Sequence, residues 1–152
     1  MKLPSAHYAR PELARQFADE LLGLTPLSDA PNGLFLAGDR RTGKSEFLRL
    51  DLLTELTARG VLVLYVDLLQ SKQTPAAATM QVLQQAVREN AGPVAKFAMS
   101  IGLEKIAVPG IFTIDLKGLG DAHGLSVYQV LHLLRQGTGK RVALIIDEAQ
   151  HA

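Results

Sequence analysis

The chain has 152 residues, of which 47% are hydrophobic, and this composition suits an α/β domain with a sizeable core. Its formal net charge of +1 is too small to predict strong attraction to nucleic acid or to anionic membranes. The absence of cysteine excludes disulfides and thiolate metal sites. No apolar run approaches the roughly 18 residues of a membrane span, and the first residues lack the apolar core of a signal peptide. We therefore expect a soluble, cytoplasmic protein with no membrane partner.

Residues 1–33 predict one helix followed by a loop. Pro11 suits the first turn of a helix that runs to about Leu22, with Gly23 as its C-terminal cap. The loop that follows contains two prolines and ends at Gly33. The predicted core face of the helix holds Leu13, Phe17 and Leu21.

Residues 34–59 predict a strand, a glycine loop and a helix. Leu34–Ala37 is apolar, as a buried strand should be, and Glu46–Arg59 carries leucines at every fourth position along one helix face. Between them, Gly-Asp-Arg-Arg-Thr-Gly-Lys-Ser at 38–45 fills the pattern G-x-x-x-x-G-K-[ST]. The two glycines permit backbone angles that turn N–H groups toward an anion, and the helix start adds further N–H groups and the positive end of its dipole. The stretch is therefore predicted to be a phosphate-binding P-loop.

The P-loop pattern assigns a role to each of its residues. Lys44 is predicted to act in catalysis by reaching the β- and γ-phosphates, and the Ser45 hydroxyl is placed to ligand Mg²⁺. Arg40 and Arg41 either contact a neighbouring subunit or add positive potential over the phosphates, or they form a solvated basic tip, which is the interpretation we favour. A glycine-rich turn that only joins a strand to a helix is the alternative for the whole stretch. The predicted nucleotide-binding residues are Gly38, Asp39, Arg40, Arg41, Thr42, Gly43, Lys44, Ser45 and Glu46.

The middle of the chain predicts a second strand, a helix and an insertion. Val61–Val66 is continuously apolar, as a parallel strand buried on both faces should be, and it ends at Asp67. This carboxylate either approaches Mg²⁺ or the nucleotide, or only ends the strand. Thr74 and Pro75 begin a helix that runs to about residue 90. An insertion over about residues 94–120 is predicted to hold a short helix and a β-hairpin over 105–117.

The last part of the chain predicts a helix and a third strand that ends in two acids. Ser126 and Gln129 form a capping box for the helix. The strand at 142–146 is wholly apolar and is followed by Asp147 and Glu148, the Walker B arrangement. Asp147 is predicted to hold the water shell of Mg²⁺, and Glu148 to polarise the attacking water as a general base. Such a pair alone is weak evidence, because strands often end in acids, and the P-loop upstream strengthens it.

These motifs together resemble the AAA-type ATPases of the additional-strand, catalytic-glutamate division. The resemblance rests on Gly-Asp-Arg-Arg-Thr-Gly-Lys-Ser, Leu-Tyr-Val-Asp-Leu and Leu-Ile-Ile-Asp-Glu-Ala-Gln-His, and it covers nearly all of residues 10–152. It implies a three-layer αβα P-loop NTPase fold with a mainly parallel sheet, in which residues 1–33 lead into the nucleotide site and residues 34–152 form a partial core. It also implies that the nucleotide is ATP rather than GTP.

The resemblance also implies parts that this sequence does not show. Members of that division continue after Walker B with a sensor strand, an arginine finger and a helical lid, so we expect the core to be incomplete at its C-terminus. The sensor strand of that division lies between the P-loop strand and the Walker B strand.

Two functions remain in play. The first is Mg²⁺-dependent ATP hydrolysis by a motor or switch domain of a larger protein, and the second is nucleotide binding without hydrolysis in a structural or regulatory role. A P-loop kinase is a weaker option because no lid arginines follow, and a GTPase is disfavoured because no Asn-Lys-x-Asp motif occurs. A homo-oligomer or a larger complex stays open, and DNA enters as a partner only by analogy with the family.

Overall fold

The structure is a computed structural model that describes residues 7–26, 33–39, 41–69, 74–90, 92–94, 96 and 127–151. It contains helices and a two-stranded parallel sheet, so the predicted mixture of helix and strand is confirmed. The chain forms two compact units, residues 1–60 and residues 61–152, each with buried apolar residues of its own. Within the described ranges, no helix has the length and apolar character needed to cross a membrane.

Helix α1 (Pro11–Leu21) opens the first unit, as the sequence predicted. Pro11 stands in its first turn, and Gly23 follows its end in the left-handed conformation, with φ of 68°. Its buried residues are the alanines Ala14 and Ala18 rather than the predicted leucines, which are only half-buried. Small side chains on the buried face allow close approach of the neighbouring helix.

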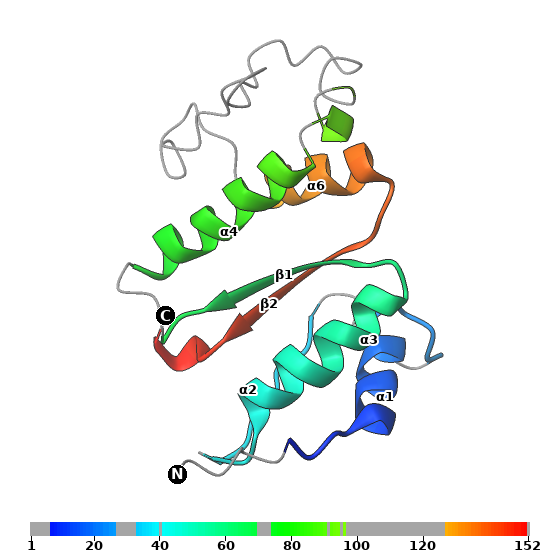
Figure 1. The fold of residues 1–152 in the computed structure, drawn as a ribbon, viewed down its shortest axis with the longest axis vertical. Coiled ribbons are helices and arrows are strands. Elements are labelled where there is room, and N and C mark those ends of the chain that lie inside the picture. Colours follow the sequence, from blue (N-terminus) through cyan, green and yellow to red (C-terminus); the bar gives the residue numbers. More distant parts are fainter. Residues whose placement is uncertain are drawn as a thin grey trace. The chain divides into compact units, whose positions relative to one another are not determined.

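A continuous helical stretch follows the P-loop and is made of α2 (Lys44–Glu46), η2 (Phe47–Leu52) and α3 (Leu53–Ala58). Helix α1 lies against η2 and α3 (Figure 1). The helix was predicted, but its central π-helical turn was not. The side chains of Phe47 and Leu52 are both buried and lie five residues apart, which is the repeat that a π-helical turn brings onto one face. The ring of Phe17 meets Phe47 edge-on, with centroids 5.5 Å apart.

Charged side chains connect the C-terminal end of the same helical stretch to helix α1. Arg59 donates hydrogen bonds to Asp19 of α1 and to Glu55 one turn earlier. These bonds, led by the one to Asp19, raise the pKa of Arg59 above its ordinary value. Because the guanidinium is charged at any physiological pH, the group works as a permanent cation that joins the two helices.

The predicted buried strand at Leu34–Ala37 is wrong. Residues 33–39 have no regular secondary structure, and Phe35 is 99% exposed. An apolar segment becomes a strand only where a neighbouring strand accepts and donates its backbone hydrogen bonds. No strand in the described part of the chain pairs with this segment.

The second unit is built on strands β1 (Leu62–Asp67) and β2 (Val142–Asp147), which pair with each other in parallel, the strand direction expected for a mainly parallel sheet. Their register runs from Leu62 opposite Val142 to Asp67 opposite Asp147. Helices α4 (Pro75–Glu89) and α6 (Val127–Thr138) lie on one face of this pair (Figure 1). The predicted cap of α4 is confirmed, because Thr74 Oγ1 accepts the N–H of Ala77 at 3.3 Å.

The core of the second unit lies between this sheet face and the two helices. Leu83, Val87 and Leu134 are buried in it. A close contact also joins α6 to residues 92–94: a Cβ on Gly137 would lie 2.7 Å from the Cα of Val94, so only glycine fits there. The buried cluster consists of Leu64, Leu83, Ala86, Val87, Val94, Val130, Leu133 and Leu134.

Several predicted features lie outside the described residues. They are the hairpin at 105–117, most of the helix expected from residue 94, the capping residue Ser126 and the loop residue Arg40. The insertion over about residues 94–120 therefore stays a prediction.

Candidate phosphate-binding loop and acidic strand end

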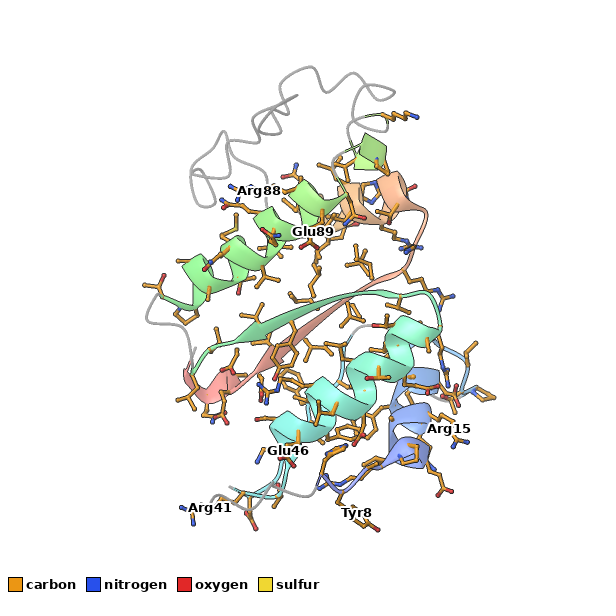
Figure 2. The ribbon with its side chains drawn as sticks, in the orientation of Figure 1. Tyr8, Arg15, Arg41, Glu46, Arg88 and Glu89 are labelled. Carbon is orange, nitrogen blue, oxygen red and sulfur yellow. The ribbon has the colours of Figure 1, made fainter. Side chains whose placement is uncertain are left out.

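The P-loop residues form a tight turn into the start of a helix. Gly43 is the N-cap, with φ of 79° and ψ of 24°, and Lys44 is the first helical residue. Arg41 also has a positive φ, of 65°, and its side chain is exposed at the outer tip of the loop (Figure 2). Left-handed residues of this kind are typical of backbone concavities that bind anions. Among the described residues no side chain caps the helix start, so its first N–H groups lack a side-chain capping partner there.

The ammonium group of Lys44 closes the loop from inside. Its Nζ donates to the carbonyl oxygens of Gly38 and Asp39, each at 2.6 Å. The Thr42 hydroxyl donates to the same Asp39 carbonyl at 2.8 Å. An ammonium group has three protons, and two are used in these bonds. The third can meet a phosphate oxygen bound at the helix start.

Arg10 contributes a second cation to the loop. Its Nη2 donates to the Thr42 carbonyl at 2.9 Å. A Cβ on Gly43 would lie only 2.9 Å from the same nitrogen, so glycine at this position makes room for the guanidinium as well as for the left-handed backbone. The positive charge beside the helix start favours an anionic ligand.

Asp51 fastens the segment before α1 to the helix that follows the P-loop. Its Oδ2 accepts the backbone N–H of Arg10 at 3.1 Å, and its Oδ1 meets His7 Nε2 at 2.9 Å. The Asp51 side chain is only 8% exposed and lies in the π-helical turn. These contacts of Asp51 therefore fix the backbone of Arg10, whose side chain reaches the P-loop.

The second unit carries the acidic end of β2. Asp147 is 6% exposed, and both oxygens of its carboxylate accept hydrogen bonds. The Tyr65 hydroxyl donates to Oδ2 at 2.6 Å, and the backbone N–H of Glu148 donates to Oδ1 at 2.9 Å. Glu148 has φ of 59°, a conformation that is strained for a side chain of this size, and Gln150 Nε2 donates to its Oε2. Strain of this kind concentrates at functional sites.

The acidic end of β2 fits an ion that arrives bound to a ligand better than it fits a metal ion held by the protein alone. Among the side chains that the structure describes, no three of His, Asp or Glu are grouped to hold a metal ion. Mg²⁺ is usually bound by one or two carboxylates together with phosphate and water oxygens. Each oxygen of Asp147 can accept a second bond beyond the one it makes, so this carboxylate fits such an ion.

Comparisons with protein-family models, with curated proteins and with solved structures found no match. The functional assignment therefore rests on the motifs and on the geometry within each unit. The P-loop residues belong to residues 1–60, and Asp147 and Glu148 belong to residues 61–152.

Two residues with a place in these groups were missed by sequence reasoning. Tyr65 is the one aromatic residue of strand β1, and it stands two positions before Asp67 on the same face. Asp51 is an acid between two leucines of the P-loop helix. In both cases the signal is a polar atom within an apolar segment, which must find a partner when it is buried.

Proposed function

We propose that this protein binds ATP through residues 38–46 and hydrolyses it with Mg²⁺, and that its core has a three-layer P-loop fold. The observation that carries the proposal is the loop, in which left-handed Gly43 leads directly into a helix start and Lys44 sits among the loop carbonyls. A turn that only joined two elements would need neither the lysine nor the cation of Arg10. The choice of ATP follows from the resemblance noted in the sequence.

Each motif residue has a chemical role in this proposal. Backbone N–H groups of the loop and of the first helical turn hold the phosphates, and Lys44 neutralises charge on the β- and γ-phosphates. The residues that would hold Mg²⁺ are Ser45, through its hydroxyl, and Asp147, through its carboxylate. Bound Mg²⁺-ATP supplies the phosphoryl group and the charge that polarises it.

Glu148 is the proposed general base. A carboxylate oxygen of Glu148 accepts the proton of the attacking water, which the phosphates alone do poorly. Two features of its own segment hold the side chain, namely the left-handed backbone and the amide of Gln150 that donates to Oε2. Holding the base in one orientation reduces the motion needed to reach the water.

The test measures binding of a fluorescent ATP analogue and release of phosphate from ATP, each with Mg²⁺. Lys44→Ala removes a charged hydrogen-bond donor, so we expect binding to weaken by about 10- to 100-fold. Lys140→Ala is the matched control, because it removes an exposed lysine from the turn before β2. Glu148→Gln is expected to keep binding and to lower turnover by about 10²- to 10⁴-fold, whereas Glu89→Gln on the exposed side of α4 should change neither.

The outcomes separate the two functions. If the parent chain does not bind ATP, the proposal is refuted. Binding that depends on Lys44 but leads to no turnover would favour the alternative of a nucleotide-binding protein with a structural or regulatory role. The same samples test the partners that the resemblance implies: light scattering with and without ATP reports a homo-oligomer, and added duplex DNA reports any effect on turnover.

A further inference from the structure

The hydroxyl of Tyr65 is directed at the carboxylate of Asp147. Tyr65 lies opposite Ile145 in the parallel pair, and Asp147 follows Ile145 on the same face of the sheet. The hydrogen bond from the Tyr65 hydroxyl to Oδ2 is 2.6 Å long, at the short end of the range for an O–H donor. The two residues are 82 positions apart in the sequence, so the fold and not local geometry brings them together.

Two donors fix the orientation of this carboxylate. Tyr65 holds Oδ2 and the Glu148 N–H holds Oδ1, so rotation about the last bond of the Asp147 side chain would break both hydrogen bonds. The residue is almost fully buried, where a polar group is stable only if hydrogen bonds replace those it made with water. If residue 65 only filled apolar space, phenylalanine would pack equally well at this position.

We infer that Tyr65 is a positioning residue, which keeps the Asp147 carboxylate turned so that its remaining lone pairs can bind Mg²⁺ or accept a hydrogen bond from a water on that ion. The inference rests on the proposed function, because it concerns the metal that accompanies ATP. Tyr65 itself contacts neither the nucleotide nor the ion in this role. Groups that orient a metal ligand in this way typically change metal affinity by about 10- to 100-fold when they are removed.

The experiment compares the parent with Tyr65→Phe, which deletes one oxygen atom and keeps the ring. For each protein the dissociation constant of the fluorescent ATP analogue is measured in Mg²⁺ and in EDTA, and the ratio of the two gives the contribution of the metal. We expect Tyr65→Phe to leave the EDTA value within about twofold and to reduce the ratio by about tenfold. Tyr128→Phe is the control, because that ring is 76% exposed on α6, and it should leave both values unchanged.

A double-variant measurement shows whether Tyr65 acts through Asp147. In an Asp147→Asn background, Tyr65→Phe should cause no further loss of the Mg²⁺ contribution, because the carboxylate it positions is gone. Independent losses in the two variants would overturn the inference. Tyr65→Met also lacks the hydroxyl and takes the place of Tyr65→Phe if thermal unfolding shows that the phenylalanine variant does not fold.

The failures of this inference and of the proposed function have different signatures. A parent chain that does not bind Mg²⁺-ATP overturns both. If Mg²⁺ enhances ATP binding equally in the parent and in Tyr65→Phe, only the role of Tyr65 is overturned. The Tyr65 hydroxyl then contributes to stability alone. That case would show as a lower melting temperature of Tyr65→Phe with an unchanged Mg²⁺ contribution.

Discussion

The strained backbone at Glu148 predicts that glycine is more stable than alanine at this position. An L-residue in the left-handed region costs about 1–2 kcal/mol, and glycine is free of that cost. Glycine loses about 0.4–1 kcal/mol relative to alanine because its unfolded chain is more flexible. With φ of 59° at residue 148, we expect Glu148→Gly to be more stable than Glu148→Ala by about 1 kcal/mol. In an ordinary helix, alanine is more stable than glycine by a similar amount.

Comparison of these two variants isolates the backbone. Both lose the carboxylate and the contact from Gln150, and both can keep the residue-148 N–H that Asp147 accepts. Thermal unfolding followed by circular dichroism should place the glycine variant about 2–4 °C above the alanine variant. Equal melting temperatures, or a higher one for alanine, would refute the claim that this position is strained. Neither variant is expected to hydrolyse ATP. A glycine variant that is stable but inactive would show that stability and activity favour different residues at position 148.

Three further predictions follow from packing and from charge. Gly137→Ala places a Cβ against the Val94 backbone and should destabilise the protein by about 1–3 kcal/mol in urea unfolding, whereas Gly92→Ala, with nothing within 4 Å, should be neutral or slightly stabilising. Leu83→Ala empties a fully buried site and should cost about 2–5 kcal/mol in the same assay. Arg10→Ala should weaken binding of the ATP analogue by about 2- to 10-fold. The control Arg15→Ala removes an exposed arginine of α1 (Figure 2) and should leave binding unchanged. Equal effects of the two variants would contradict the role given to the contact between Arg10 and Thr42.

Sequence reasoning predicted the elements whose signals are local. Pro11 and Thr74-Pro75 mark helix starts that the structure confirms, because capping depends on a few neighbouring residues. The strands β1 and β2 were found from continuous aliphatic runs. Leu34–Ala37 has the same local character but is not a strand, since strand formation depends on a partner that no local pattern reports.

The predicted faces of the helices were less accurate than their positions. Leu13 was expected in the core, yet Ala14 next to it is buried, because the packing of two helices selects the face and small residues allow the closest approach. The π-helical turn at η2 shifts the buried face by one residue, which no rule based on 3.6 residues per turn can follow. The P-loop and the acidic strand end were found by pattern, but Tyr65 needed the register of two strands that are distant in the sequence.

The register of β1 and β2 also limits how this sequence can change in length. Side chains alternate between the two faces of the sheet, so a deletion of one residue inside β2 would carry Asp147 to the face that packs on α4 and α6. A carboxylate among those apolar side chains would be buried without its tyrosine partner, at a cost of several kcal/mol. Insertions between the elements leave this pairing intact. Relatives of this chain should therefore vary in length between α4 and α6, and hardly at all within the six paired positions of the two strands.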